Sequence, residues 1–247
     1  MTAPYFLVAT EAVDSDTLVV GGAEGRHAVT VKRMQPGEAV MVGDGAGRVG
    51  HGVVLSVAGK DELIVSITSR STVARSEPQV MVIQALPKGD RGETAVETMT
   101  EVGVDVIVPW AASRCITSWK GERAQRSLAK WRTTARESAK QSRRAYLPEL
   151  APLASTTEVA QLVSSAGIAL VLHESGHLPI GSIDIPRAGT IVIVVGPEGG
   201  VTEAELAELT SAGGLATVMG PAVMRTSTAG TVAAGIVLAG TDRWLAR

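Results

Sequence analysis

A glycine-rich segment late in the chain stands where a ligand could be held. Gly196–Gly200, with the sequence Gly-Pro-Glu-Gly-Gly, comes directly after the β-branched run Ile191–Val195. Glycines let the backbone approach a ligand closely, and the helix predicted next, with capping-box spacing between Thr202 and Glu205, would present free N–H groups. The segment fits a ligand site and a plain tight turn equally well. It matches neither the dinucleotide fingerprint nor a phosphate loop, which disfavours dinucleotide and ATP sites.

Two further loops follow apolar runs in the same way. One is 220–229, which contains Arg225, the only basic residue between Arg187 and Arg243. Its place beside a predicted strand end favours a ligand or catalytic contact over a surface ion pair. The other begins at His173. A lone histidine is more often structural than catalytic, and no second ligand stands near it, so we predict no metal.

A strongly basic stretch lies in the middle of a slightly acidic protein. Residues 113–147 carry ten Lys and Arg side chains against two acids, whereas the whole chain has a net charge of −2. A solvated helix usually mixes signs to gain pairs four residues apart, and this stretch does not. Its one-sided charge favours a polyphosphate partner such as RNA.

The loops require a sheet that brings strand ends together, and the pattern from residue 79 onward predicts one. Apolar strands alternate with helices, which is typical of βαβ units and a mostly parallel sheet, where ligands bind at the carboxyl ends of strands. The predicted strands are 79–86, 104–110, 168–173, 190–195 and 215–219, and the predicted helices are 93–102, 121–142, 158–165, 202–211 and 227–240.

Residues before 70 follow a different pattern. Short strands at 5–9, 17–20, 39–42, 49–57 and 63–67, separated by Gly and Asp, suggest a small barrel, with one helix at 24–34. The polar segment 70–78 is the candidate linker. We therefore predict two domains, residues 1–72 and 73–247.

Composition narrows the class of protein further. The chain has 247 residues, 45% of them hydrophobic, and a single cysteine, Cys115. One cysteine excludes a disulfide scaffold and a cysteine-based zinc site. No apolar run approaches the roughly 18 residues of a membrane span, and the first residues do not look like a signal peptide. We expect a soluble, cytosolic protein.

Several short motifs, in their order and spacing, resemble one known family. They are Arg26-His27-Ala28-Val29 with Val31-Lys32-Arg33, Lys88-Gly89-Asp90-Arg91, Glu101-Val102-Gly103-Val104, Pro109 with Arg114, Gln141-Ser142-Arg143-Arg144 with Pro148, Gly196–Gly200, and Met219-Gly220 with Met224-Arg225-Thr226. Across nearly the whole chain these resemble the 16S ribosomal RNA uracil-N3 methyltransferases of the SPOUT superfamily.

That resemblance implies an α/β fold with two parts. They are a small N-terminal PUA-like β-barrel that binds RNA and a C-terminal SPOUT domain with a parallel sheet and a deep trefoil knot. It also implies S-adenosylmethionine as cofactor, and methylation of N3 of one uridine (the U1498-type site) in the 16S RNA of the small ribosomal subunit. The SPOUT domain is expected to form a homodimer. No face of the charge-free helix Ser227–Gly240 suits water, so it must be buried in the domain core, in a partner or in both, and the resemblance implies that it lies at the dimer interface.

The resemblance assigns roles to particular residues. Arg225 and Arg144 are the catalytic candidates, because either could stabilise a uracil anion. The predicted cofactor-binding residues are Leu172, His173, Gly196, Glu198, Gly200, Val218, Met219, Gly220, Met224 and Arg225. The predicted RNA-binding residues are Arg26, Arg33, Lys88, Arg91, Arg114, Arg123, Arg126, Gln141 and Arg144.

Two positions depart from the family pattern, and two other functions stay open. Arg143 stands where the family usually has Gly, and Ser227 where it usually has an acid. The first adds charge to the expected RNA surface, and the second puts in doubt an acid's role there. The alternatives are a SPOUT ribose 2′-O-methyltransferase acting on ribosomal or transfer RNA, and a non-enzymatic RNA-binding assembly factor whose glycine loops are only turns.

Overall fold

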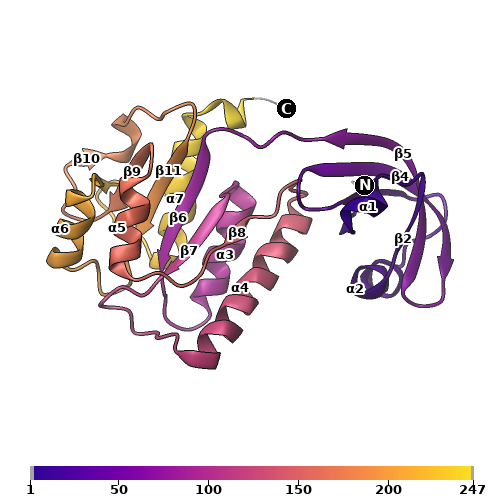
Figure 1. The fold of residues 1–247 in the computed structure, drawn as a ribbon, viewed down its shortest axis with the longest axis horizontal. Coiled ribbons are helices and arrows are strands. Elements are labelled where there is room, and N and C mark those ends of the chain that lie inside the picture. The colour runs from indigo at the N-terminus through magenta and orange to yellow at the C-terminus, as the bar shows by residue number, and fades with distance from the viewer. Residues whose placement is uncertain (1–2, 246–247) are drawn as a thin grey trace. The chain divides into compact units, whose positions relative to one another are not determined.

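The computed structural model describes residues 3–245, and the chain folds into two compact units. The first runs to Arg75 and also contains Ala139–Leu147, and the second contains Ser76–Ser138 and Pro148 onward. The predicted division between residues 72 and 73 put residues 139–147 in the second domain, whereas they belong to the first unit. Figure 1 labels most elements of each unit.

The first unit is built on one five-stranded sheet. Its order is β1-β3-β4-β5-β2, with β1 parallel to β3 and the other pairs antiparallel. The predicted barrel is thus observed as a sheet with β1 and β2 at its edges. The strands are β1 (Tyr5–Leu7), β2 (Thr17–Val20), β3 (Ala39–Gly43), β4 (Arg48–Ala58) and β5 (Glu62–Thr72).

Alternating side chains form the core of this unit. Val40 and Val42 of β3 and Leu63 and Val65 of β5 are buried together with Phe6. That period of two is expected for strands with one buried face. Two short helices, α1 (Thr10–Val13) and α2 (Gly22–Arg26), accompany the sheet.

The helix predicted over 24–34 is not uniform. After α2 the backbone continues as a π-helical turn over His27–Val31, and Arg33 then adopts a positive φ of 54°. Such turns widen the helix and are uncommon, and the sequence gives no sign of one.

The second unit is a seven-stranded, fully parallel sheet, as the alternation of strands and helices predicts. Its order is β10-β12-β9-β11-β6-β7-β8. The strands are β6 (Gln79–Ala85), β7 (Val106–Trp110), β8 (Glu149–Leu150), β9 (Ile168–Leu172), β10 (Leu178–Pro179), β11 (Thr190–Val195) and β12 (Leu215–Val218). The central strand β11 lies between β9 and β6, with Ile193 opposite both Leu170 and Val82.

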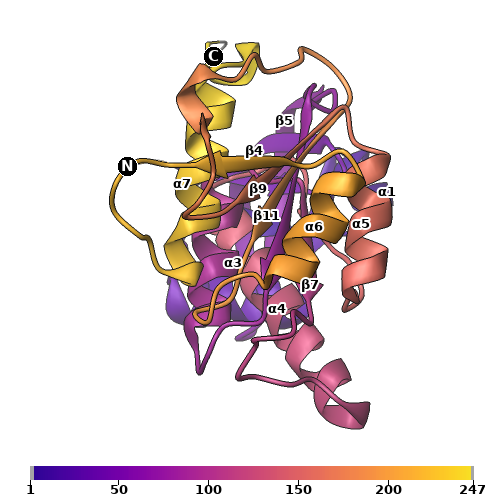
Figure 2. The same ribbon diagram turned by 90° about the vertical axis from the view of Figure 1, so that its left-hand side faces the viewer.

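Helices cover both faces of this sheet, and strand alternation decides which side chains meet them. Ile191 and Ile193 pack on the side of α3 and α7, while Val192 and Val194 pack on the side of α5 and α6. Figure 2 shows these two pairs of helices on opposite sides of the strands. The helices are α3 (Arg91–Val102), α4 (Gly121–Gln141), α5 (Thr156–Ser164), α6 (Glu203–Ser211) and α7 (Thr226–Ala239).

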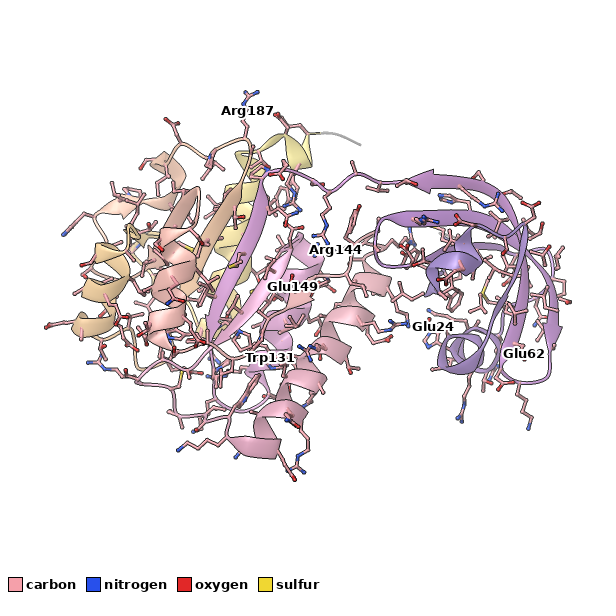
Figure 3. All side chains as sticks on the ribbon, viewed as in Figure 1. Glu24, Glu62, Trp131, Arg144, Glu149 and Arg187 are labelled. Atoms are coloured by element: carbon pink, nitrogen blue, oxygen red, sulfur yellow. The ribbon has the colours of Figure 1, made fainter. Side chains whose placement is uncertain are left out.

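One side of the basic helix α4 is apolar and packs against other residues of the second unit. Trp131, labelled in Figure 3, is buried and makes an edge-to-face contact with Trp119, with ring centroids 4.9 Å apart. Gly92 of α3 lies against the same ring, and a Cβ there would come within 2.7 Å of it. Within residues 3–245, no helix is both long and apolar enough to cross a membrane.

Candidate cofactor pocket

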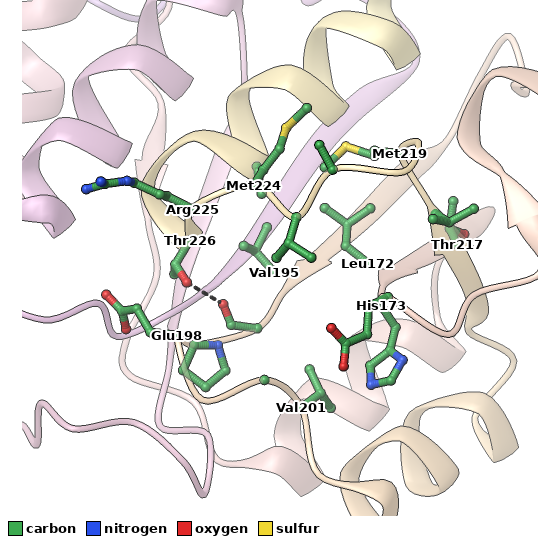
Figure 4. A pocket seen from close by; sticks show the side chains of 18 of the residues that line it. Leu172, His173, Val195, Glu198, Val201, Thr217, Met219, Met224, Arg225 and Thr226 are labelled. Atoms are coloured by element: carbon green, nitrogen blue, oxygen red, sulfur yellow. Dashed lines mark hydrogen bonds between the residues drawn. The ribbon is translucent and has the colours of Figure 1, made fainter.

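Three neighbouring strands end at one pocket in the second unit. Strands β12, β9 and β11 are adjacent and parallel, so their carboxyl ends lie at the same edge of the sheet. The segments that follow them enclose a pocket of about 730 Å³. That volume suits a small molecule of cofactor size. Figure 4 shows Glu198 and Arg225 on one side of this pocket and His173 on the opposite side.

The structure brings all the predicted cofactor-binding residues together. The ten of them line this one pocket, although they come from three loops separated by up to 53 positions: Leu172, His173, Gly196, Glu198, Gly200, Val218, Met219, Gly220, Met224 and Arg225. Sequence reasoning left out several other lining residues, among them Arg114, Ala222 and Thr226. Arg114 was expected on RNA, not at this pocket.

The Gly196–Gly200 turn takes its shape partly from its own packing. Gly200 has a φ of +74° and donates its N–H to the Pro197 carbonyl at 2.9 Å. A Cβ at Gly199 would come within 3.0 Å of the Arg114 Cβ. The turn thus favours glycine at 200 for its backbone conformation and at 199 for close packing against Arg114, and it leaves open main chain beside the pocket.

Two hydrogen bonds tie the start of α7 to neighbouring strand ends. The Thr226 hydroxyl donates to the Gly196 carbonyl at 3.0 Å, the dashed line in Figure 4. The Gln84 side chain, at the end of β6, donates to the Thr226 carbonyl at 3.3 Å. Arg225 is the N-cap of this helix and its side chain is exposed. The arrangement fixes the Arg225 backbone at the pocket while leaving its guanidinium accessible.

Glu198 links the pocket to a second basic segment. Its carboxylate accepts a hydrogen bond from the Lys88 N–H at 3.1 Å and forms an ion pair with Arg91 at 3.5 Å. Two of the predicted RNA-binding residues, Lys88 and Arg91, thus stand beside a pocket-lining residue.

His173 is held locally. Its Nδ1 accepts a hydrogen bond from the Ser175 N–H at 3.2 Å and lies 2.7 Å from the Ser175 hydroxyl. Among residues 3–245, no group of three or more His, Cys, Asp or Glu side chains could hold a metal ion.

Glu205 joins the pocket wall to a loop that the sequence did not connect with it. Its carboxylate accepts from the N–H and hydroxyl of Ser113, at 2.8 and 2.9 Å, and of Thr202, at 3.0 and 2.8 Å. Burial alone would raise the pKa of this carboxyl, but these four hydrogen bonds outweigh it and hold the pKa below its ordinary value.

The other predicted RNA-binding residues fall in both units. Arg26, Arg33, Gln141 and Arg144 belong to the first unit, whereas Arg123 and Arg126 lie exposed on α4 in the second. Arg144, the second catalytic candidate, is not among the residues that line the pocket.

Comparisons with known proteins match both parts of the chain. Residues 75–238 match a family model described as an RNA methyltransferase domain, and residues 20–68 match one described as an RNA methyltransferase PUA domain. A Ribosomal RNA small subunit methyltransferase E from Mycobacterium bovis is 44% identical over 99% of this chain and 94% of its own. The protein of the same name from Bacillus subtilis is 29% identical over 91% of each chain.

A solved structure is similar over the same extent. It is a Ribosomal RNA small subunit methyltransferase E from Neisseria gonorrhoeae bound to S-adenosyl methionine. It is 28% identical to this chain, covers 96% of it and 98% of its own length, and superimposes with a TM-score of 0.84.

Proposed function

This chain belongs to the family of ribosomal RNA small subunit methyltransferases E, and from that premise we propose that it methylates N3 of one specific uridine in 16S ribosomal RNA. It is an S-adenosylmethionine-dependent ribosomal RNA methyltransferase. The finer assignment, to N3 of uracil, rests on the motif resemblance. The observation that supports methyl transfer from S-adenosylmethionine is the one pocket lined by all ten residues expected around the methyl donor.

The pocket fits S-adenosylmethionine in size and in chemistry. Main-chain groups at Leu172, Val218–Gly220 and Met224 would hold the adenine, and the Gly196–Gly200 turn leaves room for the methionine part. When bound, the cofactor supplies an electrophilic sulfonium methyl group. The chain's task is to hold the base so that N3, methyl and sulfur lie in line.

The reaction also requires control of charge on the uracil. N3–H is a weak acid and must lose its proton, to water or to a carboxylate, as the methyl group is transferred, so negative charge develops on the ring. Arg225 is a pocket-lining cation and is our first candidate for stabilising that charge, and Arg144 is the second. N3 lies on the Watson–Crick edge of the base, so the target nucleotide must be unpaired or extruded when it reacts.

The cofactor assignment is tested by filling the pocket. Ala222 lines it and is exposed, so Ala222→Trp adds bulk there without disturbing a buried core. We expect calorimetry to show S-adenosylmethionine binding to the unmodified protein and none to this variant. Ala207→Trp, at an exposed position of α6 outside the pocket, is the control and should bind normally. Equal binding by all three proteins would refute the site.

The reaction is tested on its product. Small ribosomal subunits lacking the modification are incubated with the enzyme and labelled cofactor, and the labelled nucleoside is identified and mapped. We expect N3-methyluridine at one position. A 2′-O-methylated nucleoside would assign the ribose reaction instead, and absence of label would indicate a binding factor.

We also propose that the protein acts as a homodimer. Helix α7 has no charged residue, and two of its large apolar side chains, Val232 and Ile236, are each 37% exposed one turn apart. The nearby Trp244 is 52% exposed. Ala234, on the same helix, is fully buried within the single chain, so a charge there would disrupt the fold and would not test the interface.

Three finer statements complete the proposal. The resemblance supports a trefoil knot in the second unit, tested by tracing the backbone in an experimental structure, where an untied path would contradict it. The basic residues of the two units are proposed to bind the RNA substrate. We place the reaction in the cytosol, where bacterial ribosomal RNA is found, and fractionation of cells checks this.

A further inference from the structure

One buried carboxylate does more than cap its helix. Glu205 lies in the first turn of α6 and is 4% exposed. One of its oxygens, Oε2, accepts from the N–H and hydroxyl of Thr202, which completes the capping box. The other, Oε1, accepts from the N–H and hydroxyl of Ser113, 92 positions away in the chain. The Thr156 hydroxyl lies 3.4 Å from the same oxygen.

A second helix in this protein shows what capping alone requires. Helix α5 has the same capping box, in which Oε2 of Glu158 accepts from both the N–H and the hydroxyl of Ser155 at 2.7 Å. Glu158 is exposed, and one oxygen suffices for its cap. Burying a carboxylate is costly unless it is fully hydrogen-bonded. The contact of Glu205 with Ser113 is therefore additional to capping and fixes the loop that contains Ser113.

That loop carries a cation to the pocket. Arg114 follows Ser113, lines the pocket, and is exposed. Its Nη1 donates to the Gly199 carbonyl at 3.0 Å, which lays the side chain along the glycine turn. A guanidinium has five N–H donors in a rigid fork. This single contact leaves most of them available at the pocket rim.

We propose that Glu205 is a positioning residue that, through Ser113, seats Arg114 at the pocket rim, where the Arg114 guanidinium binds a phosphate of the RNA strand beside the target nucleotide. The inference rests on the proposed function. Phosphate is the partner because Arg114 is exposed to solvent and opens the one-sidedly basic stretch 113–147. A planar fork also matches phosphate oxygens in geometry.

The test compares three variants with a matched control. Glu205→Gln keeps the shape but leaves one oxygen where two are used, so either Thr202 or Ser113 loses its acceptor. Arg114→Ala removes the cation, and Ser113→Ala weakens the clamp while leaving the helix cap intact. Glu158→Gln alters the capping box of α5, whose residues Ser155 and Glu158 do not line the pocket. For each, RNA affinity is measured over a range of salt concentrations, together with S-adenosylmethionine affinity.

We expect Glu205→Gln and Arg114→Ala each to weaken RNA binding about five- to tenfold. Each should also reduce the slope of log affinity against log salt by ~1, because about one phosphate contact is lost. Ser113→Ala should act in the same direction with a smaller effect. Cofactor affinity should stay within about twofold, and Glu158→Gln should behave as the unmodified protein. The double variant Glu205→Gln/Arg114→Ala should be no weaker than Arg114→Ala alone.

Three results would overturn the inference. They are an additive double variant, an unchanged salt slope in Arg114→Ala or in both Glu205→Gln and Ser113→Ala, or a loss of cofactor affinity as large as the loss of RNA affinity, which would place the guanidinium on the cofactor's carboxylate. Should Glu205→Gln fail to fold, the salt slope of Ser113→Ala tests the inference instead, and an unchanged slope in that variant would overturn it. RNA binding is measured without turnover, so these results stand apart from whether N3-methyluridine is formed.

Discussion

Arg143 adopts a backbone conformation that ordinarily belongs to glycine. Its φ is 53°, and its side chain is exposed just after α4 ends at Gln141. A left-handed residue other than glycine costs roughly 1 kcal/mol or more, because its Cβ crowds a carbonyl oxygen. This is one of the two positions where the sequence departs from the resembled family, which usually has Gly. The chain therefore carries backbone strain together with an extra positive charge.

Two substitutions separate the strain from the charge. Arg143→Gly and Arg143→Ala both remove the guanidinium, but only glycine relieves the positive φ. We expect the glycine variant to be about 0.5 to 1 kcal/mol more stable than the alanine variant, after allowance for the greater freedom of glycine in the unfolded chain. Urea denaturation measures the difference. Equal free energies of unfolding would show that the conformation is not strained.

The Glu205 carboxylate makes stability depend on pH in a defined direction. Hydrogen bonds from Ser113 and Thr202 hold its pKa below the ordinary value of 4.5. A lowered folded-state pKa stabilises the protein fully above the unfolded-state pKa, and that stabilisation is lost as pH falls through the folded-state pKa. The unmodified protein should thus exceed Glu205→Gln in free energy of unfolding at pH 7, with the gap narrowing below pH ~4.5. A gap that stays constant down to pH ~3 would contradict this.

At the residue scale, local patterns predicted the loops around the pocket but not the hydrogen bonds that hold them. The three loops could be predicted because they directly follow apolar runs, and the family resemblance then indicated the individual residues. The Thr202 and Glu205 spacing likewise predicted a helix cap. The contact between Glu205 and Ser113 could not be predicted, because it depends on how β7 and α6 pack and leaves no periodic signal.

Among the elements, α7 has one face that the single chain does not bury. Ala233, Ala234 and Val237 are fully buried, whereas Val232 and Ile236 are exposed. Exposed apolar side chains one turn apart on a charge-free helix favour a protein partner. The sequence predicted burial of the helix, and the structure shows which positions face outward.

The dimer is tested at that face. Ile236→Glu places a charge where a second copy would pack, and light scattering should then report a monomer. Leu55→Glu, at a 52% exposed apolar position of β4 in the first unit, is the control and should stay dimeric. A monomeric unmodified protein at micromolar concentration, active in the methylation assay, would refute the proposal.

Long elements were predicted more closely than short ones. The helix expected over 121–142 is observed as Gly121–Gln141, and the strand expected over 190–195 as Thr190–Val195. Strands β8 and β10 are two residues long, too short for any periodicity, and were not predicted. The π-helical turn at His27–Val31 was missed because its sequence suits an ordinary helix.

For the whole molecule, a short segment late in the basic stretch completes the first unit. Tyr146 donates its hydroxyl to the Val73 carbonyl at 2.9 Å, and the Gly47 N–H donates to the Ala145 carbonyl at 3.0 Å. Lys140 forms an ion pair with Glu24 at 2.9 Å, both side chains largely buried. Contacts of this kind between distant parts of the chain leave no sequence pattern, so the division at residue 72 could not anticipate them.

The basic stretch predicts a salt dependence for the molecule's RNA affinity. Arg123 and Arg126 lie exposed on α4. Replacing both with Ala should reduce the slope of log affinity against log salt by roughly one to two and leave cofactor affinity unchanged. Arg187→Ala removes an exposed cation outside the basic stretch, labelled in Figure 3, and should leave the slope as it is. An unchanged slope in the double variant would make the stretch a solvated surface only.

We propose that the pocket at the ends of β9, β11 and β12 holds the methyl donor for N3 of one uridine. The most direct measurement is nucleoside analysis of small ribosomal subunits that lack the modification, after incubation with labelled S-adenosylmethionine and either the unmodified protein, Ala222→Trp or Ala207→Trp. We expect N3-methyluridine at a single site with the unmodified protein and with Ala207→Trp, and none with Ala222→Trp. Label on another atom, or full activity of Ala222→Trp, would contradict it.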